Sequence, residues 1–290
     1  MDITRTTTAP SDPGIYSGLS NAAYHAGPGI SKSGLDLLAR SPLHYWDRYI
    51  NPHGGRGPET EAMSFGTAVH AAILEPDDFA QWVVMDKVDR RTKDGKAAAE
   101  AAESLAAERG TRLIDRATHN TVTTIAAAVR RSTVGRHLET GVPELSVYWI
   151  DEDTGVFCRC RPDWLGVDAV VDVKTTENAS PGGFMRSAYG WRYWVQAAFY
   201  LDGLAANGLA VPQFLFAAVE KQPPYAVMGY RASESLIEAG RREYKRLLAL
   251  YAACASVNRW PGYGDMMELD LPGFAPERMS GVNATALDFG

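Results

Sequence analysis

The sequence predicts an α+β fold in which helices both precede and follow a central group of strands. Up to Gly141 the apolar residues recur at helical spacing, with an alanine-rich stretch at 97–107. Between Gly141 and about residue 175 they alternate with polar residues over short runs, which is typical of strands. Helical spacing returns at 189–204, before further strand-like runs. The predicted core order is therefore helix, three strands, helix, and one or two strands.

The elements before the strands are expected to be mostly helical. Residues 1–28 are rich in Thr, Pro, Gly and Ser and are expected to form an extended arm. A short serine-capped helix follows, and Ser41-Pro42 ends it. Further helices are expected at about 65–75, 97–107 and 116–137.

The strands follow from alternating patterns bounded by turn residues. They are expected at 144–150, 156–161, 169–175, 214–220 and 225–231, and the last long helix at about 233–255. This organisation predicts one domain at 29–260 and a tail at 261–290. Within the domain we expect a helical insertion at about 86–138 and a catalytic core at about 141–232.

Composition limits the classes of function. The chain is 46% hydrophobic and 22% charged, as in an ordinary soluble protein, and no run approaches the roughly 18 apolar residues of a membrane helix. We therefore expect a cytoplasmic protein with no membrane partner. Three cysteines argue against a disulfide framework, and the lack of a fourth argues against an iron–sulfur cluster. No GxxxxGK[ST] motif is present, so ATP is not an expected cofactor.

The charge distribution leaves two interpretations open. The net charge of −6 is unusual for a nucleic-acid-binding protein, because phosphate neutralisation supplies most non-specific affinity. The positive charge is clustered, however: residues 86–96 carry five basic and three acidic side chains, and Arg159 and Arg161 precede Asp163. Each cluster could line a basic channel or could belong to an ordinary solvated face.

A candidate metal site is formed by Asp163 and by the run Asp172-Val173-Lys174. In a strand, Asp172 and Lys174 lie on one face and Val173 on the other. A pair of carboxylates can hold a hard divalent cation, and a nearby lysine can orient or deprotonate a water. These residues together predict metal-assisted hydrolysis of a phosphodiester.

Two helices carry further candidates. His70 lies on an apolar helix, where a histidine is more often a hydrogen-bonded core residue than a ligand. Glu75, five residues further on, is expected to face elsewhere. Gln196 and Tyr200 share one face of their helix at i,i+4, where they either contact a phosphate or metal-bound water or form the edge of an aromatic core.

The order of these motifs carries a family resemblance. A glycine–histidine helix, Glu144, Pro162-Asp163, Asp172-Val173-Lys174 and Gln196-x-x-x-Tyr200 follow one another as in the PD-(D/E)XK nuclease superfamily. More closely, the chain resembles the RecE-type (exodeoxyribonuclease VIII) branch, allied to the RecB-like and phage lambda-type exonucleases, over about residues 15–255. The resemblance implies a restriction-endonuclease-like core, with a mixed central sheet of about five strands flanked by helices and with N-terminal helical additions.

The resemblance also implies roles for individual residues. His70, Asp163, Asp172 and the backbone carbonyl of Val173 are implied as ligands of Mg²⁺ or Mn²⁺, with two ions per site. Lys174 is implied to position or activate the attacking water, Gln196 and Tyr200 to contact DNA or order the site, and Glu144 to lie behind the direct ligands. Candidate DNA-binding residues are Ser31, Ser33, Arg90, Arg91, Lys93, Arg159, Arg161 and Thr175.

The implied activity is processive 5′→3′ degradation of linear double-stranded DNA by a ring-shaped homo-oligomer of phage or prophage type. The 3′ single-strand tails would serve recombination with a RecT-type single-strand annealing protein. Two alternatives stay open: another RecB-like nuclease, of the CRISPR-adaptation or helicase-associated type, and a catalytically silent DNA-binding module with the same fold.

Overall fold

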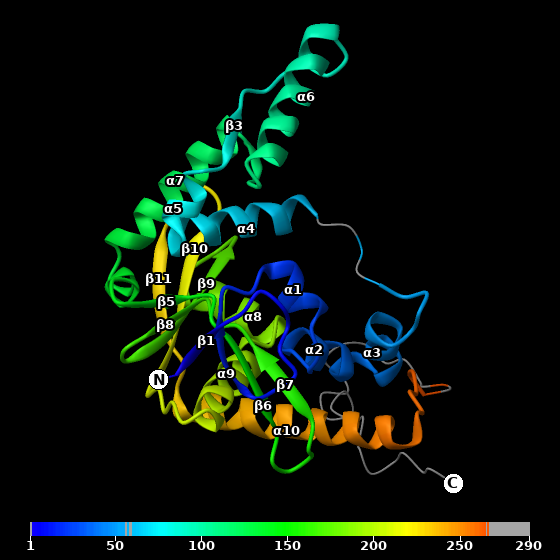
Figure 1. The fold of residues 1–290 in the computed structure, drawn as a ribbon. Helices are drawn as coiled ribbons and strands as arrows, with labels where there is room; N and C mark the ends of the chain where they lie inside the picture. Colours follow the sequence, from blue (N-terminus) through cyan, green and yellow to red (C-terminus); the bar gives the residue numbers. More distant parts are fainter. Residues whose placement is uncertain (1, 56, 58–59, 265, 267–290) are drawn as a thin grey trace.

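A mixed sheet lies at the centre of the computed structural model, which describes residues 2–55, 57, 60–264 and 266 (Figure 1). Within these residues the sheet has five strands in the order β11-β10-β9-β8-β5. They are β5 (Gly141–Pro143), β8 (Trp164–Gly166), β9 (Ala169–Thr176), β10 (Gln213–Glu220) and β11 (Val227–Arg231). Strands β9 and β10 are parallel, and the other neighbours are antiparallel.

Strand β9 is buried on both faces because helices cover each side of the sheet. Val171 and Val173 pack with residues of α4 (Glu61–Leu74) and α7 (Arg116–Arg131). Val170 packs on the opposite face with residues of α9 (Tyr193–Ala206) and α10 (Glu234–Val257). Strand alternation therefore directs Asp172, which shares the face of Val170, toward α9.

A second sheet corrects the expectation for the N-terminus. Its order is β1-β2-β6-β7, formed by β1 (Ile3–Arg5), β2 (Gly14–Ser17), β6 (Ser146–Ile150) and β7 (Phe157–Cys160). The expected arm at 1–28 is thus not extended within residues 2–28, which supply two strands and helix α1 (Asn21–Ala26). The reason is that Ile15, Leu19 and Tyr24 are buried, although polar residues and breakers surround them in the sequence.

Four further helices lie outside the elements described so far. They are α2 (Lys32–Arg40), α3 (Pro42–Tyr49), α5 (Pro76–Phe79) and α8 (Pro181–Gly190). Helices α2 and α3 lie near α1, and α5 lies beside α4 (Figure 1). Ser31 caps α2, and Ser41 both ends α2 and caps α3. Helix α8 was not expected, because its Pro-Gly-Gly start is typical of a loop. No helix in the described part of the chain is long and apolar enough to cross a membrane.

Within the insertion expected at 86–138, the part around α6 (Lys93–Glu108) projects from the rest of the molecule (Figure 1), whereas α7 packs against the central sheet. The insertion is not purely helical. Helix α6 stands between β3 (Val83–Met85) and β4 (Leu113–Asp115), which pair in parallel. Helix α7 ends at Arg131, and a separate 3₁₀ turn covers Val134–Leu138.

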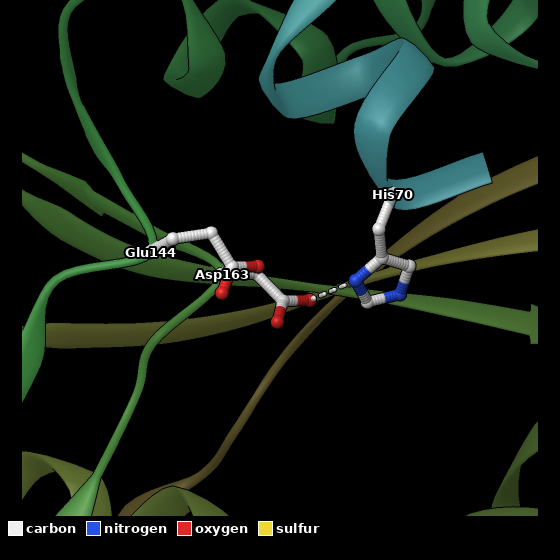
Figure 2. A group of neighbouring side chains, drawn as sticks. All are labelled: His70, Glu144 and Asp163. Atoms are coloured by element: carbon white, nitrogen blue, oxygen red, sulfur yellow. Dashed lines mark ion pairs between the residues drawn. The ribbon is translucent and has the colours of Figure 1, made fainter. Parts of the chain in front are cut away.

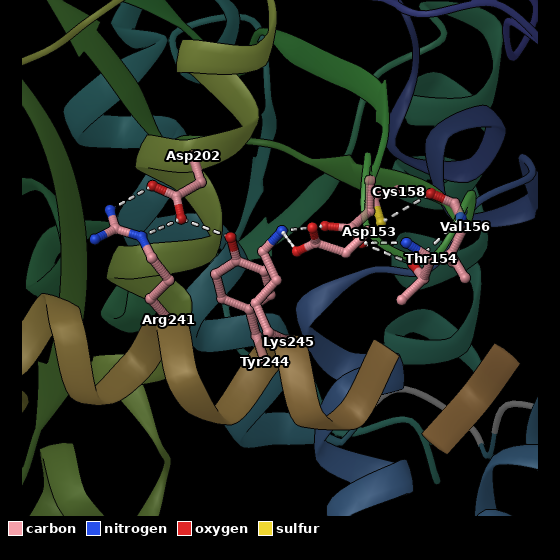
Figure 3. A network of polar contacts seen from close by, with 9 residues as sticks. Asp153, Thr154, Val156, Cys158, Asp202, Arg241, Tyr244 and Lys245 are labelled. Carbon is pink, nitrogen blue, oxygen red and sulfur yellow. Dashed lines mark hydrogen bonds and ion pairs between the residues drawn. The ribbon is translucent and has the colours of Figure 1, made fainter. Parts of the chain in front are cut away.

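Basic residues of α10 hold this helix to its neighbours (Figure 3). Arg241 pairs with Asp202 of α9 at 2.6 Å, and the Tyr244 hydroxyl donates to the same carboxylate at 2.5 Å. Lys245 bonds to Asp151 at 2.7 Å and to Asp153 at 2.6 Å, in the turn between β6 and β7. These charges therefore serve the fold.

Replacing Asp202 is expected to lower stability. In Asp202→Ala, Arg241 and Tyr244 lose a charged acceptor in a half-buried place, which we expect to lower the free energy of unfolding by about 1–3 kcal/mol. Denaturant unfolding measures the change. Arg242→Ala, an exposed position on the same helix, serves as the control and should stay within about 0.5 kcal/mol. Equal stability of both variants would contradict this role.

Candidate active site

The candidate site lies where β8 and β9 separate. The two strands pair at Trp164–Val171 and Leu165–Val170, and their ladder ends there. Beyond this point two side chains form hydrogen bonds with the N–H and the carbonyl of Val173, which a longer β8 would have paired. The Val173 N–H donates to Asp163 Oδ2 at 2.7 Å, and its carbonyl lies 3.0 Å from His70 Nε2. Both candidate ligands are thus fixed to the backbone of the central strand.

The hydrogen bond between His70 Nε2 and the Val173 carbonyl determines which imidazole nitrogen carries the proton. A carbonyl oxygen only accepts, so His70 Nε2 donates and Nδ1 presents its lone pair in the neutral ring. The Val173 carbonyl, which the resemblance implies as a metal ligand, accepts this hydrogen bond and thereby orients the histidine. Nδ1 faces Asp163 Oδ2 at 3.5 Å. Two lone-pair-bearing atoms at that distance favour a cation between them.

Glu144 completes a compact group with these two residues (Figure 2). One donor atom from each of His70, Glu144 and Asp163 lies within 4.8 Å of the others. Glu144 precedes β6 with a left-handed φ of 52°, and its N–H donates to the Asp163 carbonyl at 3.1 Å. Such a backbone is costly for a residue with a side chain and is typical of functional sites.

The electrostatics of this group suit a divalent ion. Burial, and then the charge of Asp163, raise the pKa of Glu144 to about 8, although Arg161 opposes the shift. Desolvated acids so close together are mutually unfavourable until a cation joins them. Two carboxylates and an imidazole are also a donor set that Mn²⁺ and Mg²⁺ accept. The residues present therefore fit the ion that the resemblance implies.

Asp172 lies outside the compact group, which differs from the expected ligand set. Its side chain is fully buried, and it accepts a hydrogen bond from Gln196 Nε2 and pairs with Lys174 Nζ, both at 2.5 Å. Burial and the charge of Asp163 raise the pKa of Asp172 to about 6, against the effect of Lys174. The difference arises because Asp172 points from the sheet face toward α9, whereas Asp163 and His70 lie at the strand edge.

Lys174 is a cation in this site. Burial lowers its pKa, but Asp172 and Asp163 outweigh burial and raise the pKa above its ordinary value. Its Nζ also lies 4.6 Å from the centroid of the Tyr193 ring. The geometry therefore favours a lysine that orients a negatively charged group, and it disfavours one that removes a proton.

Two cavities flank these residues. A cavity of about 670 Å³ is lined by His70, Glu144 and Glu75, and one of about 340 Å³ by Lys174, Gln196 and Tyr200. Ser31 and Ser33, two expected DNA contacts, line the smaller cavity. Glu75 was expected to face elsewhere, but it ends α4 and lines the larger cavity, where its charge also raises the pKa of Glu144.

Residues of α1 were missed altogether. Asn21 and His25 line both cavities, together with Glu144 and Arg161. Helix α1 therefore borders the site. The only signal in the sequence is the serine cap at Ser20, which predicts a helix but no site.

Arg159 and Arg161, two of the expected DNA-binding residues, are buried and hydrogen-bonded within the protein. Arg159 is 3% exposed and donates to the backbone carbonyls of Tyr24, His25 and Gly27. Arg161 is 9% exposed and donates to Ser146 Oγ and the Leu19 carbonyl. Both arginines hold residues 19–27 against β7, and Arg161 also lines both cavities.

The other expected DNA contacts lie away from the two cavities. Arg90 and Arg91 are exposed on the insertion and pair with Glu103 at 2.7 Å and Asp89 at 3.0 Å. Lys93 is exposed at the start of α6. Thr175 is half-buried on the face of β9 that Val173 shares, opposite to Lys174.

Residues 31–269 match the family described as a PDDEXK-like domain of unknown function (DUF3799). No curated protein matches. A crystal structure named "putative exonuclease", from Eubacterium rectale, aligns with a TM-score of 0.55 at 14% identity and covers 86% of this chain and 96% of its own. The crystal structure of SSO0001 aligns at 12% identity, covering 67% of this chain and 88% of its own, with a TM-score of 0.28 that carries no argument.

The first of these structures confirms the predicted restriction-endonuclease-like fold, and the family match extends over most of the chain. Together they support a nuclease, and PD-(D/E)XK nucleases generally use divalent metal ions. The chain therefore belongs to the PDDEXK-like family DUF3799, within the PD-(D/E)XK nuclease superfamily.

Proposed function

We propose that the protein is a Mg²⁺- or Mn²⁺-dependent exonuclease that degrades linear double-stranded DNA from 5′ to 3′ and leaves 3′ single-strand tails. One observation carries the proposal. A group of two carboxylates and an imidazole lies beside a buried Asp172–Lys174 pair, at the end of the central strands. Anionic ligands next to a fixed cation suit a reaction in which negative charge develops on a phosphate.

The residues have separate roles in the proposed reaction: some bind the ions and others orient the substrate or the ligands. His70, Glu144 and Asp163 would hold one ion, and Asp172 supplies a further carboxylate for the second of two ions per site. When bound, such ions lower the pKa of an attacking water and stabilise the leaving oxygen. Lys174 orients the phosphate or the water as a cation, and Gln196 fixes Asp172 by its hydrogen bond.

Substrate binding is proposed at two places. Ser31 and Ser33 stand at the N-terminus of α2, where free backbone N–H groups favour phosphate, in the cavity that Lys174 lines. Arg90, Arg91 and Lys93 are exposed on the insertion, where they would meet the backbone of a bound duplex. Their exposed ion pairs are weak, so a phosphate can replace the acid partner.

The biological setting of the proposal rests on the family resemblance. It comprises a cytoplasmic enzyme of phage or prophage recombination, a homo-oligomeric ring, and a RecT-type annealing protein as partner. A ring would confine basic side chains to its channel while the exterior carries the net charge of −6. Light scattering of the purified protein tests the ring, and a monomer would contradict it.

End-labelled linear duplexes and closed circular duplexes, incubated with Mg²⁺, test the activity. We expect label to be released from 5′ ends first and the closed circle to stay intact. Cutting of the circle would contradict an exonuclease, and earlier release of 3′ label would overturn the polarity. Chelation of the metal should stop degradation.

A further inference from the structure

An exposed tryptophan stands beside the catalytic lysine. Trp191 lies between α8 and α9, is 68% exposed, and lines the smaller cavity together with Lys174 and Gln196. In the part of the chain that the structure describes, no other ring packs against its indole. A large aromatic side chain left in water next to a polar site is typical of a binding surface.

The backbone that carries this indole is fixed. The Trp191 carbonyl accepts a hydrogen bond from Lys32 Nζ at 2.6 Å, and its N–H donates to the Ser187 carbonyl at 2.8 Å. The next residue, Arg192, is left-handed with φ 55° and pairs with Glu243 at 2.9 Å. The junction is thus joined to α2 and α10, so little backbone freedom remains to be lost when a ligand binds the ring.

The neighbouring aromatic residue has a different task. The Tyr193 ring packs on Phe184 and Phe216 and lies against Lys174, so its faces are occupied. Trp191, by contrast, offers an exposed aromatic surface in this cavity. The N-terminus of α2, with Ser31 and Ser33, forms another wall. A flat ring near hydroxyl groups, backbone N–H groups and a cation matches the base and phosphate of a nucleotide.

We propose that Trp191 stacks on the base of the nucleotide next to the scissile phosphate, in the strand being cut. This inference rests on the proposed nuclease function and specifies how the substrate is held. A base inside the helix already stacks on both neighbours, so the contact requires a base that is at the duplex end or has left its pair. Stacking on tryptophan tolerates every base, which suits an enzyme that degrades any sequence.

Binding without metal tests the stacking apart from catalysis. A short thymidine oligonucleotide is titrated into the protein in EDTA while tryptophan fluorescence is recorded. The chain has seven tryptophans, so the signal of Trp191 is the difference between wild type and Trp191→Phe. We expect quenching that Trp191→Phe lacks, roughly tenfold weaker binding for Trp191→Ala, and binding within about threefold of wild type for Trp191→Phe, which keeps a stacking ring.

The matched control is Tyr189→Ala. Tyr189 is 78% exposed, lies two residues earlier on α8 and does not line the cavity, so its loss should change neither quenching nor affinity. Equal weakening by Tyr189→Ala and Trp191→Ala would indicate a general aromatic surface and would overturn the assignment. Circular dichroism of each variant verifies the fold.

Linear duplexes that carry one abasic nucleotide near the end test the same contact during the reaction. In wild type, removing the stacked base should lower kcat/KM roughly tenfold at one position. In Trp191→Ala the same lesion should have little further effect, because the two changes remove one interaction. Independent, additive losses would refute the stacking. Degradation of intact duplex without quenching would defeat this inference alone, whereas quenching without any degradation would defeat only the nuclease function.

Discussion

Asp163→Asn is expected to abolish metal-dependent DNA degradation, with a loss of at least about a thousandfold in rate. The amide oxygen can still accept the Val173 N–H, so the local backbone stays in place. The variant loses one of the two carboxylate charges that would bind the ion together with His70. Release of label from linear duplex in Mg²⁺ measures the effect.

The same variant should be no less stable than wild type in the absence of metal. The charge of Asp163 raises the pKa of both Glu144 and Asp172, so its removal relieves repulsion in a desolvated site. Added Mn²⁺ should raise the melting temperature of wild type but not of Asp163→Asn, because only a bound ion shifts the equilibrium. Asp168→Asn, an exposed acid in the turn before β9, is the control and should behave as wild type. A metal-dependent shift in Asp163→Asn would contradict the site.

Lys174→Met is expected to lower kcat by at least about a thousandfold while metal still binds. The methionine keeps the apolar part of the side chain and removes the positive charge. Lys174 is not one of the three residues of the compact group, so the ligands of the ion are unchanged. Single-turnover rates and the Mn²⁺-dependent melting shift measure the two properties separately. Lys221→Met, which removes a lysine paired with Glu177 beyond the end of the same sheet, is the control.

Removal of Lys174 leaves Asp172 buried without its partner, a change that can cost about 3–5 kcal/mol where the charge persists. If Lys174→Met folds poorly, the double variant Asp172→Asn with Lys174→Met restores a neutral pair and should regain stability without regaining activity. A double variant that degrades DNA normally would refute the role of both residues.

The central strand and its chemistry could be predicted from the sequence, because local periodicity determines them. The alternation of Val171, Asp172, Val173 and Lys174 places acid and amine together, and they pair at 2.5 Å. The i,i+4 spacing of Gln196 and Tyr200 brings both to one cavity. Each relation joins residues within one element, where geometry follows from helix or strand spacing alone.

The rest depended on contacts between segments distant in the chain. Glu144 belongs to the compact group, and its own backbone is left-handed where it bonds to Asp163. The spacing of residues in the sequence does not encode that conformation. Arg159 and Arg161 resemble DNA contacts in sequence, yet they are buried because carbonyls of residues 19–27 accept their hydrogen bonds. The tail expected at 261–290 lies largely outside the described residues.

One residue without reactive chemistry controls the spacing of two that have it. Val173 uses its peptide N–H for Asp163 and its carbonyl for His70, while its side chain packs in the apolar core under α4. Apolar replacements such as isoleucine should therefore leave both ligands in register. Proline, which has no N–H, would release Asp163 and break the strand. The backbone of Val173, and not its side chain, therefore limits which residues this position accepts. Val173 aligns the two reactive side chains although it has no reactive group of its own.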